Sequence, residues 1–514
     1  MTTIYKLKVK RIASMLFFAA VISDAGCKKG TFDINSPNPN SLSPSTVGPK
    51  YYLSSSLAGT ANLMFGGSSS AFTGPDILNT WMGYWAYSGG YTPSPILVTY
   101  QLTSNVGTGN WDNAYLNLKN YNIIQTLSSN DPTLADYKAI SLIMQSFVFQ
   151  RVVDLYNNVP YFQAFSSTNT TPAYDKGSDI YKNLISNVDS SVAIIKNARG
   201  NENVENPGEY DVMFKGDMDK WLKFANTLKL KLLMHLTETP DGPALITANL
   251  SGLTTADFLG EDENGGVNPG YSTASNAQEN PYYLNVATTV TGSAGTNSNY
   301  WRAGNYAVNF YNNNNDPRAS YFYSPNKAGK IQGRKIGSTA GNEGNDNISG
   351  VNGQGNAKSA SQDAVILTAS ESLFLQAEAA QRGYLQGDAG DLYKKAVEQS
   401  FSLLGVTDAI AAADTYISQP GNNSVNYATS PDKLKTLITQ KWAACNSFDA
   451  LESYSDWRRL KIPADLPVSD YPGNQAPHIP FRLLYPESES SYNSSVFAKK
   501  GNIDVITSKI FWQP

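Results

Sequence analysis

Two residue types that commonly build metal sites are scarce in this 514-residue chain. It has only two cysteines, Cys27 and Cys445, and only two histidines, His235 and His478. These numbers argue against a disulfide framework and against a zinc site of the usual thiolate or imidazole type. His235 and Cys445 each continue an apolar helical stripe, which indicates buried core positions. We therefore predict no metal and no cofactor.

Charge is also scarce, because Asp, Glu, Lys and Arg make up only 16% of the residues and the formal net charge is −4. A slightly acidic chain without basic runs argues against nucleic acid as a partner. Long hydrophobic runs are missing too. The segment 12–22 is apolar but has only eleven residues, which is too few to span a bilayer.

The N-terminus has the pattern of a bacterial lipoprotein signal peptide over residues 1–26. Four basic residues precede the apolar segment, and Ala25 and Gly26 stand before Cys27, the predicted site of lipid attachment. Asp24 occupies a position where an aliphatic residue is usual, so the alternative is a periplasmic or secreted protein with an incidental Cys27. Cleavage would leave a mature chain of net charge −7. Residues 27–50 are rich in Pro, Ser and Asn, which predicts a flexible tether.

The polarity of the chain comes mainly from uncharged residues, and 31 of them are tyrosines. A tyrosine ring supplies apolar area while its hydroxyl supplies a hydrogen-bonding tip. Surfaces of this kind suit neutral polar ligands such as sugars.

The clearest structural pattern lies at residues 370–404, where two apolar stripes of helical spacing flank Gly387 and Asp388. It predicts a helical hairpin of the kind that stacks into superhelices, because small alanines stand where two helices would approach closely. Similar periodicity predicts further helices at 52–65, 76–87, 112–127, 134–156, 180–195, 217–236 and 432–446.

Other segments lack this periodicity. Residues 237–365 are rich in Asn, Gly and Ser with interspersed aromatics, which indicates a long irregular region that is either a ligand surface or a set of disordered insertions. Segments 452–463 and 478–493 are expected to be mostly loop. We treat residues 51–514 as a single domain.

Several charged residues lie near apolar helix faces, and pairing explains them better than acid–base catalysis. They are Asp154, Glu371, Glu378, Asp456, Arg458 and Arg459. A glycosidase needs two carboxylates about 5–10 Å apart across one bond, and no stretch indicates such a pair. The acidic loops 261–264 and 312–316 do not follow the spacing of an EF-hand calcium loop.

Taken in order, the blocks at 137–165, 180–195, 216–236, 367–385, 440–442, 456–460 and 479–489 resemble the SusD/RagB family. The segment FDINSPNPN at 32–40 is similar to the start of the mature chain in the SusD-like branch. The resemblance implies an all-α superhelix of tetratricopeptide-type helix pairs with long irregular loop insertions. It also implies a lipid-anchored, surface-exposed outer-membrane protein that is not an enzyme. Such a protein would pass captured nutrient to a SusC-like TonB-dependent transporter.

In that family, aromatic residues on variable loops stack on sugar rings, so the resemblance indicates two groups of candidate ligand-binding residues. The groups are Trp81, Trp85, Tyr87 and Tyr91, and Tyr282, Tyr283, Tyr300, Trp301, Arg302 and Tyr306. The alternative for Trp81 is a core position, because it shares a helical face with Trp85.

The leading hypothesis is a protein that binds an oligosaccharide or polysaccharide. A peptide-binding member of the same family is a second hypothesis, since the helical scaffold is indifferent to ligand class. An all-helical glycoside hydrolase is a third. No motif in the loops names a particular sugar.

Overall fold

Helices are the main regular secondary structure in the computed structural model, which describes residues 44–66, 74–339 and 345–514. The predicted signal peptide, Cys27 and residues 28–43 of the predicted tether lie outside these ranges. The longer helices are α3 (Pro49–Phe65), α6 (Thr108–Leu127), α7 (Ala135–Tyr156), α8 (Gly177–Ala198), α9 (Met218–His235), α14 (Ala369–Gln381), α15 (Ala389–Leu404), α17 (Lys433–Cys445) and α18 (Ala450–Leu460).

Shorter elements connect these helices. The short helices are α2 (Pro44–Val47), α4 (Gly74–Trp81), α5 (Pro95–Val98), α10 (Gly242–Leu250), α11 (Pro281–Val286), α12 (Asn305–Asn313), α13 (Ala319–Phe322), α16 (Ala409–Ile417), α19 (Glu487–Tyr492) and α20 (Ser494–Phe497). Single 3-10 turns occur at η1 (Pro132–Leu134), η2 (Gly208–Tyr210), η3 (Thr255–Asp257) and η4 (Asn276–Gln278). Residues 48–514 form one compact unit, and α2 belongs to the preceding unit. In the described part of the chain, no helix is both long and apolar enough to cross a membrane.

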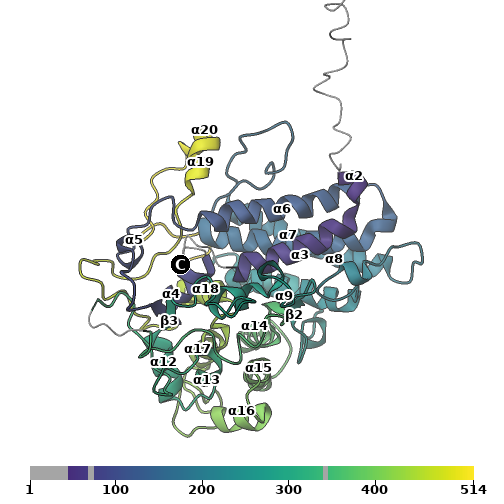
Figure 1. Cartoon of the computed structure of the whole chain (residues 1–514). Coiled ribbons are helices and arrows are strands. Elements are labelled where there is room, and N and C mark those ends of the chain that lie inside the picture. Colours follow the sequence, from purple (N-terminus) through teal and green to yellow (C-terminus); the bar gives the residue numbers. More distant parts are fainter. Residues whose placement is uncertain (1–43, 67–73, 340–344) are drawn as a thin grey trace, which may run out of the picture. The chain divides into compact units, whose positions relative to one another are not determined.

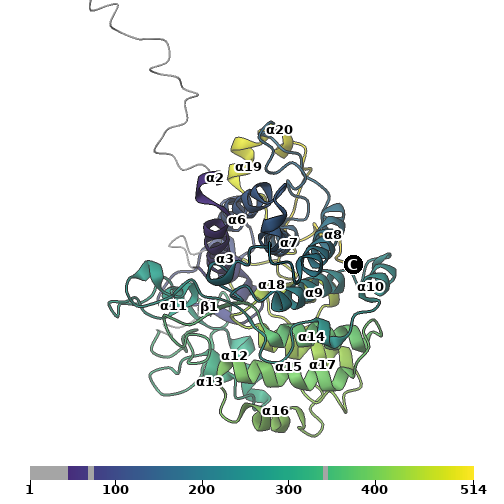
Figure 2. The same cartoon turned by 90° about the vertical axis from the view of Figure 1, so that its right-hand side faces the viewer.

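Neighbouring helices pack pairwise, as the all-α prediction requires. Helices α3, α6, α7 and α8 lie side by side, and so do α14, α15 and α16, with α9 and α18 between the two groups (Figures 1 and 2). The predicted hairpin is confirmed as α14 and α15. The Asp388 side chain accepts a hydrogen bond from the Asp391 amide at 2.9 Å and caps α15, and Ser370 Oγ donates to the Ala396 carbonyl at 2.7 Å across the pair.

The prediction that residues 452–463 are mostly loop is wrong, because α18 spans Ala450–Leu460. Glu452, Asp456 and Arg459 lie on this helix and are almost fully buried. A helix whose buried positions carry charges has no apolar stripe, so hydrophobic periodicity could not indicate it.

The prediction of a continuous helix over 76–87 is also only partly correct. Helix α4 ends at Trp81, and Trp85–Tyr87 form strand β1. Gly83 stands between them in the left-handed region at φ +74°, and an added β-carbon would lie 2.8 Å from the ring of Tyr306 on α12. Only glycine has room for this turn.

The described residues also form two small antiparallel sheets. Strand β1 pairs with β3 (Trp301–Ala303), and β2 (Gly265–Val267) pairs with β4 (Ala364–Leu367). The long irregular region predicted at 237–365 therefore contains strands as well as helices α10 to α13. The region contacts the rest of the protein where β3 pairs with β1 and where β4 packs against α3.

Candidate functional site

Strands β1 and β3 bring together the two groups of aromatic residues that the sequence indicated separately. Their register places Trp85 opposite Ala303 and Tyr87 opposite Trp301. The ring centroids of Trp85 and Trp301 are 5.9 Å apart, and those of Tyr87 and Trp301 are 5.1 Å apart. More than 200 residues of chain separate the two strands, so this pairing has no local signal in the sequence.

The rings of this cluster differ sharply in exposure. Trp85, Tyr87 and Trp301 are at most 5% exposed, whereas Tyr91 is 48% exposed and Tyr300 is half-buried. Tyr91 and Tyr300 meet edge to face at 5.3 Å, and Tyr300 packs against Tyr87 at 5.7 Å. The cluster therefore has a buried base and an accessible end, which we call the Tyr91–Tyr300 edge.

Arg302 follows Trp301 on β3 and is only 6% exposed. Its Nη1 donates to the backbone carbonyls of Ser298 and Trp301, at 2.5 and 2.8 Å. Within the described residues, neither Arg302 Nε nor Trp301 Nε1 has a hydrogen-bond acceptor. Buried donors without acceptors are uncommon, and β3 carries two of them on successive residues.

Three other candidates do not join the accessible edge. Trp81 is buried against Tyr100 and Tyr454, which is the core position that the helical spacing allowed. Tyr282 is buried and donates its hydroxyl to the Val351 carbonyl at 2.8 Å. Tyr283 is half-buried on the short helix α11.

Tyr306 faces a different feature, a cleft of about 670 Å³ between α12 and the loop 463–470, which we call the α12 cleft. Its volume lies within the range of about 300–1,000 Å³ that is typical of small-molecule sites. Helix α12 contributes five residues to its lining, which are Asn305, Tyr306, Asn309, Phe310 and Asn313. Sequence reasoning selected only Tyr306 among these. The signal for the others was present, since the asparagines and the aromatics each recur every four residues.

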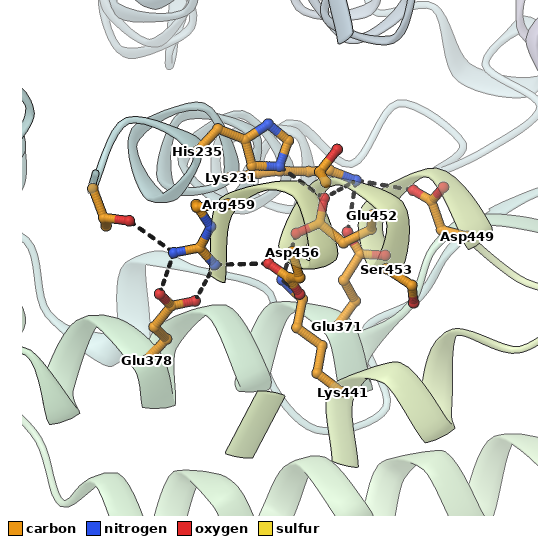
Figure 3. A network of polar contacts seen from close by, with 12 residues as sticks. Lys231, His235, Glu371, Glu378, Lys441, Asp449, Glu452, Ser453, Asp456 and Arg459 are labelled. Carbon is orange, nitrogen blue, oxygen red and sulfur yellow. Dashed lines mark hydrogen bonds and ion pairs between the residues drawn. The ribbon is translucent and has the colours of Figure 1, made fainter. Parts of the chain in front are cut away.

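The charged residues that pairing was expected to explain form a buried network where α9, α14, α17 and α18 meet (Figure 3). Lys231 Nζ contacts Glu371 at 2.8 Å, Asp449 at 2.9 Å and Glu452 at 3.1 Å. Arg459 Nη2 contacts Glu378 at 2.8 Å and Asp456 at 2.7 Å. Every one of these side chains is at most 2% exposed.

His235, Asp154 and Arg458 are also buried and also have polar partners. His235 Nε2 lies 3.1 Å from Glu452 and Nδ1 lies 3.2 Å from Asp154. Arg458 Nη1 donates to the Asp154 carbonyl at 2.5 Å. The structural role predicted for Asp154, Glu371, Glu378, Asp456, Arg458 and Arg459 is confirmed by these contacts.

Electrostatics follow from the pairing. Burial alone would raise the pKa of Glu378, but the adjacent Arg459 guanidinium lowers it to about 2. Burial would lower the pKa of His235, but Glu452 and Asp154 raise it to about 9. These groups keep fixed charges at neutral pH and lie away from solvent, so they hold the helices together.

The two acidic loops also use their carboxylates internally. Glu263 accepts from Lys223 Nζ at 2.7 and 2.9 Å, and Asp316 forms a buried ion pair with Arg318 at 2.6 Å. Among the described residues, no group of three or more His, Cys, Asp or Glu side chains is arranged to hold a metal ion.

Comparisons with known proteins agree with this architecture. A model of the SusD-like family, described as starch-binding and associating with the outer membrane, matches residues 46–486. No curated protein matches the chain. A chitin-binding SusD homologue from Flavobacterium johnsoniae has a similar structure, with 22% sequence identity, coverage of 90% of this chain and 98% of that one, and a TM-score of 0.73.

Structures from other bacteria are similarly close. A SusD-like protein from Bacteroides thetaiotaomicron is 21% identical, with coverage of 90% of this chain and 98% of that one and a TM-score of 0.72. A SusD homologue from Bacteroides vulgatus is 20% identical, with coverage of 90% and 97% and a TM-score of 0.72. At these identities the similarity to solved structures establishes only the fold. Membership of the family rests on the family model, which matches most of the sequence. The chain therefore belongs to the SusD-like family.

Proposed function

We propose that this protein binds glycans at the cell surface and passes oligosaccharide to a SusC-like TonB-dependent transporter, without itself catalysing a reaction. The observation that carries the proposal is the Tyr91–Tyr300 edge, where accessible tyrosine rings stand on a buried base of Trp85, Tyr87 and Trp301. The buried base fixes the orientation of the outer rings, so little entropy is lost when a ligand stacks on them.

The chemistry of this edge suits a sugar. A pyranose ring has an apolar face of C–H groups that an aromatic ring covers, and its hydroxyls need hydrogen-bond partners around the rim. The chitin-binding relative from Flavobacterium johnsoniae supports the same class of ligand.

The proposed location is the outer face of the outer membrane, with lipid on Cys27 as the anchor. The family description, which includes association with the outer membrane, supports this location. Replacing Cys27 by alanine should release the protein from the membrane fraction of its host. Unchanged membrane association of that variant would contradict the lipid anchor.

Glycan binding is tested with the purified protein on a glycan array and by affinity electrophoresis in gels that contain single polysaccharides. We expect Tyr91→Ala and Tyr300→Ala each to weaken binding by about tenfold, since one stacked aromatic ring contributes about 1 kcal/mol or more. The matched control is Tyr492→Ala, because Tyr492 is 83% exposed on α19 and lies outside the cluster.

Three results would contradict the proposal. They are an absence of binding to any glycan, equal effects of all three tyrosine variants, and release of reducing sugar by the purified protein. Selective retention of peptides from a protein digest would instead support the peptide-binding alternative.

A further inference from the structure

The α12 cleft contains a row of amide groups that the rest of the described protein leaves unused. Asn305, Asn309 and Asn313 follow one another at intervals of one helical turn and all line the cleft. None of their side chains makes a hydrogen bond to another described residue, and Asn309 and Asn313 are exposed. Each amide offers donors and an acceptor, so the row presents both kinds of hydrogen-bonding group along about two turns.

A second row on the same helix is aromatic and firmly supported. Tyr306 and Phe310 pack on the indole ring of Trp442, with centroids 5.4 and 5.1 Å away, and Trp442 is 1% exposed. The Tyr306 hydroxyl donates to Asp465 on the opposite wall at 2.7 Å. The cleft therefore combines ring surface with neighbouring amides, as the recognition of a sugar requires.

The walls are held by backbone hydrogen bonds, so the cleft exists before any ligand arrives. The Arg334 amide donates to the Ala303 carbonyl and the Asn305 amide donates to the Arg334 carbonyl, both at 2.8 Å. The Asp470 amide donates to the Ile336 carbonyl at 2.8 Å, which joins the loop 463–470 to the segment 334–336 that also lines the cleft. A preformed site loses less conformational entropy on binding than a flexible one.

The charges around the cleft nearly cancel. Arg334, Lys335 and Lys435 line it together with Asp465 and Asp470. Lys335 and Asp470 already pair with each other at 3.4 Å, and Asp465 already accepts from Tyr306. A strongly charged ligand of either sign would lie close to side chains of the same sign and be repelled by them, whereas a neutral polar ligand would not.

We propose that the α12 cleft is a second ligand site, separate from the Tyr91–Tyr300 edge, and that it binds a neutral, hydroxyl-rich oligosaccharide. The ligand class rests on the proposed function, because both sites would take parts of the same kind of glycan. Two sites on one protein would raise the effective affinity for a long polysaccharide that reaches both.

The test is isothermal titration of the full-length protein in detergent with neutral hexasaccharides, namely those of chitin, starch, cellulose and xylan, and with a polyuronate oligosaccharide. Three variants are compared with the unmodified protein. Asn309→Ala/Asn313→Ala removes two amides from the cleft. Asn312→Ala is the matched control, because Asn312 is also exposed on α12 but does not line the cleft. Tyr91→Ala/Tyr300→Ala removes the aromatic edge.

We expect the tyrosine double variant to keep one site for a neutral hexasaccharide, and the asparagine double variant to weaken that class of site by about tenfold or more. Asn312→Ala should have no effect. The inference is overturned if the tyrosine variant loses all binding, if the asparagine double variant binds every neutral hexasaccharide as tightly as Asn312→Ala does, or if only the polyuronate binds. Binding that depends on the asparagines but not on the tyrosines would overturn the proposed role of the edge and leave the cleft standing.

Discussion

Glu378 illustrates how a single buried carboxylate stabilises this fold. It accepts from Arg459 at 2.5 and 2.8 Å and from Arg382 Nε at 2.9 Å, and it is completely buried. Burying a charge is expensive unless a partner of opposite sign lies close by, and here two guanidinium groups surround it. The same contacts that lower its pKa to about 2 make its removal costly.

We predict that Glu378→Gln lowers the free energy of unfolding by about 3–5 kcal/mol, because it leaves the buried Arg459 with an incomplete set of partners. Urea denaturation followed by circular dichroism measures the change. Glu209→Gln is the control for the same chemical substitution, since the Glu209 side chain is 87% exposed in its 3.5 Å pair with Lys215. That control should change stability by less than about 1 kcal/mol. Similar decreases in the free energy of unfolding for both variants would show that the buried ion pairs of Glu378 do not stabilise the fold more than an exposed pair does.

At the scale of elements, short connections determine where the two ligand surfaces lie. Gly83 joins α4 to β1, and the position that a β-carbon would take there lies 2.8 Å from Tyr306 Cδ1. One turn therefore places both the β1 aromatics and the α12 ring that lines the cleft. Its left-handed φ of +74° adds a second reason for glycine.

Gly83→Ala should destabilise the protein through two effects, the left-handed backbone and displacement of the Tyr306 ring. The backbone effect alone is about 1–2 kcal/mol. Gly252→Ala isolates it, because Gly252 has φ +81° and no atom lies within 4 Å of the added carbon. We expect a lower melting temperature for both variants and a larger drop for Gly83→Ala. Equal drops would mean that the tyrosine ring moves aside without cost.

The elements also show what the sequence can predict. Helices α14 and α15 were predictable because their apolar stripes and the Asp388 cap are local signals. Helix α18 was not, because its buried positions carry Glu452, Asp456 and Arg459, which also depend on Lys441 of α17 and Glu378 of α14. The pairing of β1 with β3 involves three residues on each side, which is too short for periodicity to indicate.

At the scale of the whole molecule, the charge network joins α9, α14, α17 and α18, and the contact of His235 with Asp154 extends it to α7. Lys231 on α9 contacts carboxylates on α14 and α18 as well as Asp449, and Lys441 on α17 contacts Glu452 and Asp456. A shared set of buried ion pairs therefore fixes how these helices pack against one another (Figure 3). The stability of the whole fold should follow the protonation of these groups.

His235 makes this dependence measurable above neutral pH. Its pKa rises from 6.5 in the unfolded chain to about 9 in the folded protein, because Asp154 and Glu452 flank the ring against the opposing effect of burial. The folded protein thus holds the proton more tightly than the unfolded chain. The resulting stabilisation, about 3 kcal/mol, is complete below pH 6.5 and is lost as pH rises through about 9.

We therefore expect the free energy of unfolding, measured in urea at intervals from pH 6 to pH 9, to fall steadily as pH rises. His235→Gln removes one titrating group, so the variant should be less stable at pH 6 and should lose less stability than the unmodified protein between pH 6 and pH 9. A smaller loss remains in the variant, because burial raises the pKa of Glu371 to about 7. Because the unmodified protein and the variant share every other titrating group, subtracting the two curves gives the contribution of the imidazole together with its coupling to Asp154 and Glu452. Parallel curves for the two proteins would show that His235 is neutral in the folded state and that the network is held by its lysines and arginines alone.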